Sequence, residues 1–193
     1  EARRRLGLDL QRKYLGIVAT LRNWKGHTYL LEAFAQLATT QPDWDLVLVG
    51  DGPQRHNIEK LVGILNLEGR VRLVGNRDDV ERWLDVFDVF VLPSYGEEGV
   101  SQSVMQAMAT GLPVVATTVG AMAEAVKHEH TGLLVPPRNT EALYDALACL
   151  MHDDALRHHF GAAGLDHARR HFGIEPMLAR MEAVFRKVHG EKS

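Results

Sequence analysis

Short, continuous apolar runs alternate along this chain with stretches in which apolar residues recur three and four positions apart. The runs lie at residues 14–19, 46–49, 71–74, 86–92, 114–116 and 133–135. Runs without polar alternation are typical of strands covered on both faces, and the stretches between them have the spacing of helices. The pattern therefore predicts an α/β fold, a Rossmann-like parallel sheet of about six strands with right-handed crossovers and helices on both faces.

The chain becomes mostly helical from Asn139 onwards. We expect a single domain over residues 1–193, with a core at 14–152 and extra C-terminal helices at 153–189. Glycines at 161–164 and in the segment 171–176 predict breaks that separate three helices. No strand follows the last helix, so it either packs on a neighbouring domain or caps this one, and the sequence leaves both open.

Composition narrows the class of protein. The chain is 46% apolar and 24% charged, with a net charge of −3, so charge gives no reason to expect nucleic acid as a partner. The single cysteine, Cys149, excludes an internal disulfide, and its place in a helical apolar pattern predicts a buried thiol. The first residues lack a signal-like apolar segment and an initiator Met, so we expect a cytoplasmic protein and a fragment of a longer chain.

Polar residues follow most of the predicted strands. Arg22 and Lys25 follow the first run, residues 75–77 the third, 93–99 the fourth and 117–120 the fifth. Ligands of open parallel sheets bind beyond the carboxyl ends of the strands, so these residues meet at one edge. That edge collects cations, glycines, small hydroxyls and one carboxylate, which predicts an anionic, polar ligand. The two cations after the first strand suit a diphosphate.

A glycine loop after the fourth strand leads into a helix with a polar stripe. Glu98, Gln102, Gln106 and Thr110 fall four apart, so the spacing places them on one helix face. Backbone N–H groups at such a loop suit a phosphate, and the polar side chains suit hydroxyls. The combination predicts a phosphorylated sugar or a nucleotide-sugar as the ligand.

The same segment resembles family 4 of the glycosyltransferases. That family carries a Glu, seven intervening residues and a second Glu, followed by Ala-Met-Ala-X-Gly-X-Pro-Val. Glu98 stands at the first position, Gln106 at the second, and residues 107–114 read Ala-Met-Ala-Thr-Gly-Leu-Pro-Val. The resemblance continues, in the family's order, through Trp24-Lys-Gly-His27, Val49-Gly-Asp-Gly-Pro53, Val91-Leu-Pro-Ser94 and Thr131-Gly-Leu-Leu-Val135.

The resemblance implies the C-terminal, donor-binding half of a two-domain, retaining glycosyltransferase, whose N-terminal acceptor domain is absent here. It implies no cofactor and no metal in the donor site, and we expect the domain alone to be inactive. The implied catalytic residues are Glu98 and Lys25. The diphosphate would contact Arg22, Lys25, Gly99, Val100 and Ser101, the ribose Gln106, and the base Gly75, Asn76 and Arg77.

Two positions depart from the family's pattern. Gln106 replaces the carboxylate that holds the ribose hydroxyls. An amide can still bind a diol, but it lacks the negative charge that strengthens these hydrogen bonds by about 1 kcal/mol. The family's Arg follows a Gly directly, but Thr20 holds that place, so Arg22 substitutes for it or Lys25 acts alone. Lys25 is the firmer assignment.

The expected partners are a UDP-, GDP- or ADP-linked sugar and a saccharide or glycolipid acceptor in polysaccharide or lipopolysaccharide synthesis, with no nucleic acid. The arginines of the last helices, Arg169, Arg170 and Arg186, favour a solvated helix face, and peripheral contact at the inner face of the membrane is the alternative that they leave open. Three alternatives stay open. A nucleotide-sugar epimerase or a sugar phosphorylase would share the fold, and a non-catalytic nucleotide-sugar sensing or interaction domain would fit the loss of a carboxylate at Gln106.

Overall fold

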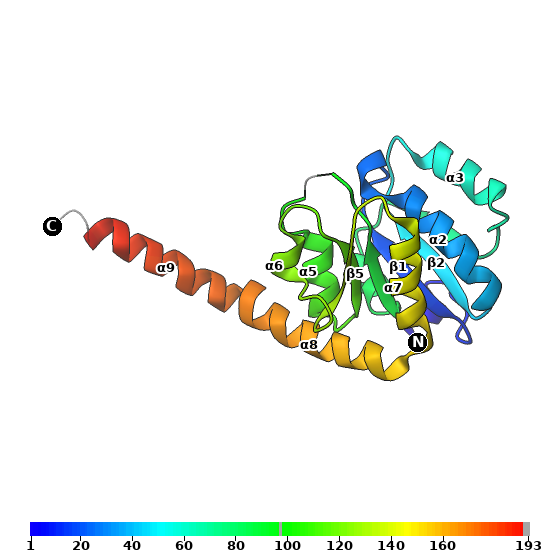
Figure 1. The fold of residues 1–193 in the computed structure, drawn as a ribbon. Coiled ribbons are helices and arrows are strands. Elements are labelled where there is room, and N and C mark those ends of the chain that lie inside the picture. The colour runs from blue at the N-terminus through cyan, green and yellow to red at the C-terminus, as the bar shows by residue number, and fades with distance from the viewer. Residues whose placement is uncertain (97, 191–193) are drawn as a thin grey trace.

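The computed structural model describes residues 1–96 and 98–190, so Glu97 and residues 191–193 lie outside the described part. Six strands form one parallel sheet in the order β3-β2-β1-β4-β5-β6 (Figure 1). Their bounds are β1 (Lys13–Val18), β2 (Trp44–Val49), β3 (Val71–Gly75), β4 (Val89–Leu92), β5 (Val114–Thr117) and β6 (Gly132–Val135). The predicted Rossmann-like sheet is confirmed, and its order reverses direction between β1 and β4.

Burial explains why the strands read as continuous apolar runs. Every residue of the central strands β4 and β5 is buried, because helices cover both faces there. The edge strand β3 is only half-buried and carries Arg72 on its exposed side. The register pairs Leu15 of β1 with Leu46 of β2 on one side and with Val89 of β4 on the other.

Helices occupy both faces of the sheet. Figure 1 shows β5 between α7 on one side and α5 on the other, with α2 packed beside α7 and α8 beside α5. The helical elements are α1 (Ala2–Arg5), η1 (Asn23–Lys25), α2 (His27–Thr40), α3 (Arg55–Ile64), α4 (Val80–Leu84), α5 (Gln102–Ala109), α6 (Met122–Ala125), α7 (Thr140–His152), α8 (Asp154–Phe172) and α9 (Ile174–Gly190). The predicted helix start at Asn139 is confirmed, because its side chain accepts a hydrogen bond from the Ala142 N–H at 2.9 Å.

The strand predicted at 86–92 is too long. Val86 and Phe87 form a turn after α4, and β4 begins only at Val89. Asp88 explains the difference, because its carboxylate accepts hydrogen bonds from the Tyr14 N–H at 2.7 Å and from Arg3 at 2.8 Å. Val86 and Phe87 are buried all the same, so apolarity alone does not separate them from the strand.

The break predicted at 161–164 does not exist, because α8 runs through it without interruption. One of the two glycines serves close packing instead. A Cβ at Gly161 would lie 2.2 Å from the carbonyl oxygen of Gly111, whereas one at Gly164 would make an ordinary contact at 3.5 Å with that of Thr131. Gly161 thus lets α8 approach the segment after α5. The break predicted within 171–176 is confirmed at Gly173, between α8 and α9.

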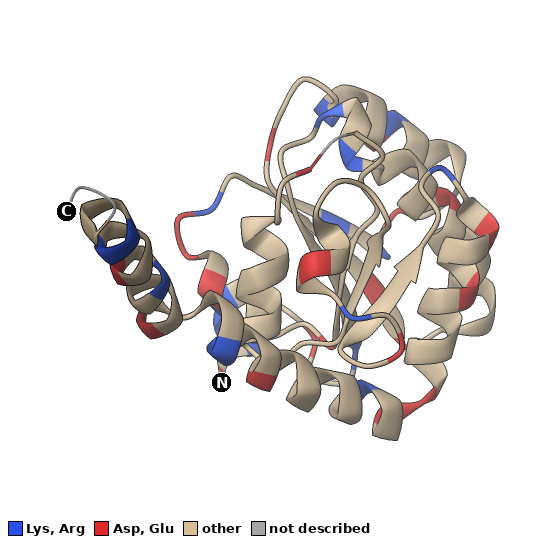
Figure 2. Cartoon of the chain, turned by 60° about the vertical axis from the view of Figure 1, so that its left-hand side comes forward, with Lys and Arg blue, Asp and Glu red and all other residues tan. Residues whose placement is uncertain are grey.

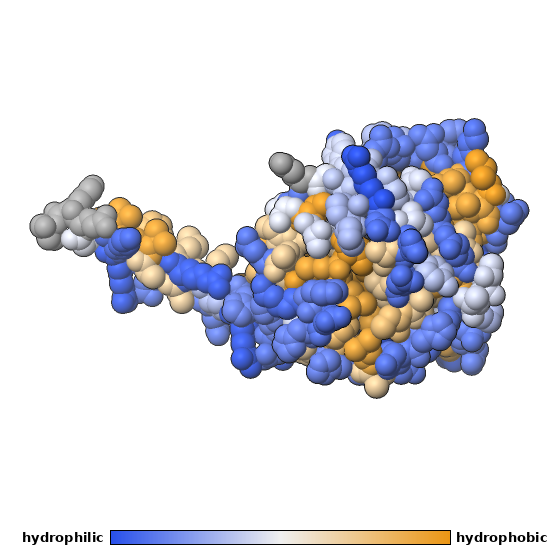
Figure 3. Space-filling view, in the orientation of Figure 1, coloured by the Kyte–Doolittle hydropathy of each residue, from blue (hydrophilic) through white to orange (hydrophobic). Residues whose placement is uncertain are grey.

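Helix α9 extends away from the sheet and has no buried residue (Figure 1). Its apolar side chains form a stripe with helical spacing, and all are about half exposed or more: Ile174, Met177, Leu178, Met181, Val184, Phe185 and Val188. Figure 3 shows orange patches along this arm. The alternative in which the last helix caps this domain is therefore wrong.

Cys149 is exposed, so the predicted buried thiol is wrong. Helix α7 turns Leu143, Leu147 and Leu150 inward, and Cys149 lies on the side facing away from the sheet. A helical apolar pattern fixes which face is buried only when the neighbouring elements are known. The sequence pattern predicted that Cys149 is buried, whereas the adjacent Leu150 is the residue that packs inward.

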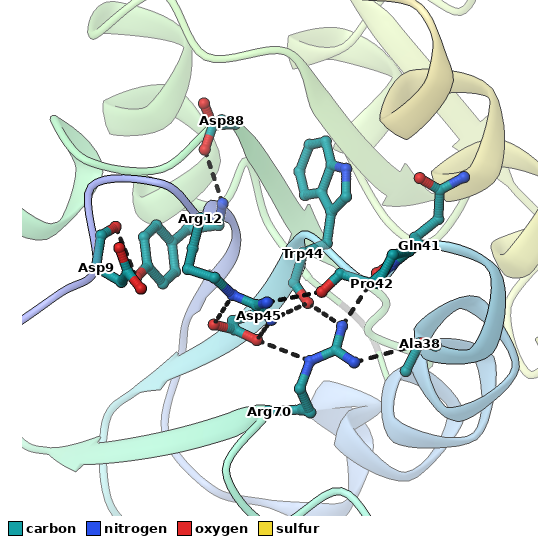
Figure 4. A network of polar contacts seen from close by, with 10 residues as sticks. Asp9, Arg12, Ala38, Gln41, Pro42, Trp44, Asp45, Arg70 and Asp88 are labelled. Atoms are coloured by element: carbon teal, nitrogen blue, oxygen red, sulfur yellow. Dashed lines mark hydrogen bonds and ion pairs between the residues drawn. The ribbon is translucent and has the colours of Figure 1, made fainter.

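A polar network joins the amino ends of the strands, at the edge opposite the candidate ligand site (Figure 4). Asp45 of β2 accepts from Nε of Arg12 at 2.7 Å and from Nε of Arg70 at 2.9 Å. The guanidinium groups also donate to backbone carbonyls, Arg12 to Pro42 at 2.7 Å and Arg70 to Gln41 at 3.0 Å. Because these donors are occupied, the network is a structural tie between the segments that precede β1, β2 and β3.

In the view of Figure 2, Lys and Arg residues are interspersed with Asp and Glu residues along the cartoon. Within residues 1–96 and 98–190, no helix is long and apolar enough to cross a membrane.

Candidate functional site

Two loops meet where the strand order reverses, beyond the carboxyl ends of β1 and β4. Tyr95 donates its backbone N–H to the carbonyl of Trp24 at 2.8 Å, which ties the loop after β4 to the loop after β1. Gly26 has φ 77°, and a Cβ there would lie 1.9 Å from the carbonyl oxygen of Pro93. Only glycine therefore permits this approach. In open α/β sheets such a switch point is where ligands bind.

Lys25 and Glu98 form an ion pair between these two loops. The side chains are only 18% and 12% exposed, so solvent screens the pair weakly. The hydroxyl of Ser94 donates to the same carboxylate oxygen at 2.8 Å. The site thus presents an ammonium group and a carboxylate side by side, each able to exchange its partner for a ligand.

Glu98 does not lie on the helix face that its spacing predicted. Helix α5 begins at Gln102, and Glu98 belongs to the preceding loop. The loop after β5 fixes its backbone, because the Ala121 N–H donates to the Glu98 carbonyl at 3.0 Å. Gly120 has φ 52°, and a Cβ there would lie 1.8 Å from that same oxygen. The loop conformation, rather than helical periodicity, turns the carboxylate towards Lys25.

The other residues predicted to contact the diphosphate lie close to Lys25 or to Glu98 in the sequence. Arg22 is exposed, with its guanidinium 5.0 Å from the centre of the Trp24 ring. Gly99, Val100 and Ser101 form the loop that enters α5, and Ser101 is the residue before its first turn. Their backbone N–H groups precede a helix N-terminus, which favours negative charge.

Gln106 is exposed on α5, one helical turn after Gln102. No side-chain hydrogen bond to another described residue holds it. Its amide is therefore open to a ligand that lies along this helix.

The three residues predicted to read the base lie at the far edge of the sheet. Gly75 has φ 72° and accepts a hydrogen bond from the Gly50 N–H at 2.8 Å, and Asn76 is exposed beside it. Arg77 donates to both carboxylate oxygens of Asp79, at 2.9 and 3.1 Å. The structure thus brings Lys25 and Glu98 into contact, whereas Arg77 is engaged with the start of α4.

Three residues near the site were missed from the sequence. Ser94 donates its hydroxyl to Glu98, and Arg138 lies in the loop between β6 and α7, for which the sequence carried no site prediction. His27 is only 3% exposed, and its ring nitrogens have no hydrogen-bond partner within the described chain. Burial lowers the pKa of His27 to about 4. It borders a polar cavity of about 30 Å³ that Arg22, Asn23, Thr28, Gln54 and Asn57 also line.

No three His, Cys, Asp or Glu side chains gather to hold a metal ion within the part of the chain that the structure describes.

Comparison with known proteins identifies the family. Residues 12–153 match the glycosyl transferases group 1. The chain belongs to that family. Among the relatives of this group 1 glycosyltransferase, the lipopolysaccharide core biosynthesis mannosyltransferase LpsB of Rhizobium meliloti is 32% identical over 192 residues, which are 96% of this chain and 54% of LpsB.

Solved structures of glycosyltransferases share the fold. HepE of Anabaena, in complex with UDP-glucose, is 25% identical and superposes with a TM-score of 0.87 over 96% of this chain and 51% of HepE. The C-terminal domain of the group 1 protein LpcC of Francisella tularensis is 26% identical, with a TM-score of 0.78 over 84% of this chain and 87% of that domain. The chain thus corresponds to the C-terminal domain of a group 1 glycosyltransferase and spans about half the length of LpsB and HepE.

Proposed function

We propose that this domain binds a nucleotide-diphosphate sugar and presents it for retaining transfer to a saccharide or lipid-linked acceptor. Transfer needs the remainder of a two-domain protein, so we expect the domain alone to turn over little or nothing. The donor site would work without a metal, because basic side chains and a helix N-terminus supply the charge that a cation would otherwise supply.

The observation that carries this proposal is the Lys25–Glu98 ion pair at the switch point. A diphosphate bound beside the loop before α5 would draw the ammonium group of Lys25 away from Glu98. The carboxylate, still held by Ser94, would then accept hydrogen bonds from hydroxyls of the transferred sugar. The two charges therefore match the two halves of a nucleotide-sugar.

Catalysis would be mainly electrostatic. As the bond between the sugar and the diphosphate stretches, negative charge grows on the leaving phosphate oxygens. Lys25, Arg22 and the backbone N–H groups of residues 99–101 would stabilise that charge. Glu98 would face the positive charge that grows on the sugar. The acceptor is oriented by the rest of the protein, across a cleft that closes over the donor.

The nucleoside end would follow α5 and the edge of the sheet. Gln106 is exposed where a ribose would lie, and Arg77 could read a base only after it leaves Asp79. The UDP-glucose complex of HepE favours a UDP-sugar as the first donor to test. LpsB, a lipopolysaccharide core mannosyltransferase, supports a role in surface polysaccharide assembly. Cytoplasmic location and membrane contact stay predictions.

Calorimetric titration of the chain with UDP, GDP and ADP tests the donor site. We expect one nucleotide to bind selectively, and Lys25→Ala to weaken it about 10- to 100-fold, the value of a charge-assisted hydrogen bond. Lys127→Ala removes another lysine, whose ammonium group donates to the Ala123 carbonyl at 2.9 Å, and serves as the control. Equal affinity in wild type and Lys25→Ala would contradict the proposal.

A further inference from the structure

Arg138 has an unusual backbone conformation. It lies in the loop between β6 and α7, and its φ of 58° is in the left-handed region that favours glycine. The other non-glycine residues with positive φ in the described chain are Asn66 and Glu129, and both precede strands at the opposite edge of the sheet. A strained backbone at the carboxyl edge points to a role for the side chain that it positions.

Among the residues that the structure describes, an aromatic ring holds the guanidinium of Arg138 and no carboxylate pairs with it. It lies 4.5 Å from the centre of the Tyr95 ring, and Tyr95 packs edge-on against Tyr29 with ring centres 5.8 Å apart. A guanidinium over an aromatic ring keeps its N–H groups available at the rim of its plane. No carboxylate or carbonyl accepts from Arg138 among the residues that the structure describes.

Tyr95 connects this cation to the donor site. Tyr95 directly follows Ser94, whose hydroxyl donates to Glu98. The backbone N–H of Tyr95 donates to the carbonyl of Trp24. Glu32 of α2 accepts from the hydroxyl of Thr140, two residues after Arg138, at 3.1 Å. Arg138 is therefore an exposed positive charge at the same edge as Glu98.

We propose that Arg138, positioned by Tyr95, binds a phosphate or carboxylate group of the acceptor. The inference rests on the proposed function, because it places the acceptor beside the donor sugar at Glu98. The donor diphosphate is matched by Arg22 and Lys25 in the loop after β1. Arg138 comes from the loop after β6, so it meets a group that approaches from the other side of Tyr95. An acceptor without an anionic group gains nothing there.

The test uses NMR titration of the chain with glucose 6-phosphate, in the presence of saturating UDP so that the diphosphate site is filled. Glucuronate replaces the phosphate by a carboxylate, and glucose removes the anion. We expect one of the two anionic sugars to shift the amide signals of Tyr95 and Arg138, and glucose to leave them in place. The comparison of the two tells phosphate from carboxylate.

Two variants separate binding from stability. Arg138→Gly removes the cation and relieves the positive φ, and Arg138→Asn removes the cation with a side chain that tolerates this conformation. We expect both to weaken the anionic sugar at least tenfold, with UDP affinity within twofold of wild type. The Tm of Arg138→Gly should not fall. Lys127→Ala, at a lysine whose ammonium group donates to the carbonyl four residues earlier, should leave all values unchanged.

Several outcomes would overturn the proposal. Unchanged binding of the anionic sugar in both variants would show that Arg138 does not bind it, and a large fall in Tm for Arg138→Gly would show a structural role instead. A parallel loss of UDP affinity would assign Arg138 to the donor. If UDP itself does not bind the wild type, the proposed function fails, while the titration with glucose 6-phosphate alone still reports on Arg138.

Discussion

The ammonium group of Lys25 pairs with the carboxylate of Glu98 across 73 positions of sequence, at the point where the sheet reverses its strand order. Neither side chain is more than a fifth exposed. In the free domain each charge therefore satisfies the other. A diphosphate that binds Lys25 must compete with Glu98, so the ion pair sets part of the cost of donor binding.

Glu98→Gln should consequently raise the affinity for bare UDP. The amide keeps the size of the side chain but removes the charge that competes for Lys25. For a pair of this burial we expect about 1 kcal/mol, or roughly a fivefold gain in affinity by calorimetry. The same variant should lose sugar transfer in the two-domain protein, because the charge opposite the sugar is gone.

Ser94→Ala is the matched control, since it removes a hydrogen bond to Glu98 but leaves the carboxylate charged. It should not produce the gain. A Glu98→Gln domain that binds UDP as weakly as wild type would show that Lys25 does not contact the diphosphate.

Gln106→Glu should improve nucleotide binding. Gln106 is exposed on α5, so the substitution costs no packing. A carboxylate accepts from both ribose hydroxyls, whereas the amide brings one acceptor and one donor. The gain of about 1 kcal/mol corresponds to roughly fivefold in affinity for UDP. The matched control is Gln102→Glu, the same change one turn earlier on the same helix. Equal effects of the two would indicate general electrostatics instead of a ribose contact.

The sheet could be predicted from the sequence because the central strands are buried on both faces, so their residues form continuous apolar runs. Boundaries failed where tertiary contacts decide them. Asp88 caps the N–H of Tyr14 and so starts β4 later than the apolar run does. Gly161 and Gly164 suggested a break, but both lie within α8, where the carbonyl oxygen of Gly111 approaches Gly161 too closely for a side chain.

The sequence predicted at which edge of the sheet the candidate site lies, but not how its residues contact one another. The rule that ligands bind beyond the carboxyl ends of strands placed Lys25 and Glu98 on the same side. Their contact depends on the strand order, which puts β1 beside β4, and on Gly120, which lets the next loop close over Glu98. Arg138 could not be ranked from the sequence, because its stacking on Tyr95 joins two distant loops.

Gly120→Ala should destabilise the domain. Its φ of 52° disfavours any side chain, and the new Cβ would lie 1.8 Å from the backbone carbonyl oxygen of Glu98. A backbone clash cannot be relieved by a rotamer change, so we expect a loss of about 2–4 kcal/mol and a fall in Tm of roughly 5–12 °C. Displacement of Glu98 should also weaken its pairing with Lys25.

Thermal unfolding followed by circular dichroism measures this effect. Gly63→Ala is the control, because only the end of the flexible Glu68 side chain lies near its Cβ, at 3.4 Å. That substitution in α3 should leave Tm unchanged or slightly higher. An unchanged Tm for Gly120→Ala would mean that the loops after β4 and β5 do not pack as described.

Acidification should destabilise the domain through His27. Burial lowers the pKa of His27 in the folded protein to about 4, from 6.5 in the unfolded chain. The unfolded chain therefore binds a proton between these values that the folded domain does not, and stability falls as pH drops from 6.5 towards 4. The loss approaches about 1.4 kcal/mol per pH unit and about 3 kcal/mol in total. Above pH 6.5 the residue contributes no pH dependence.

Urea unfolding at pH 7.5, 6, 5 and 4.5 measures how the free energy of unfolding changes with pH. His27→Leu should remove the part of this slope that His27 causes, while His158→Ala, at an exposed position, should retain it. Parallel slopes for wild type and His27→Leu would show that the imidazole is protonated in the folded domain, and the polar cavity beside Arg22 would then hold a charged group instead of a neutral one.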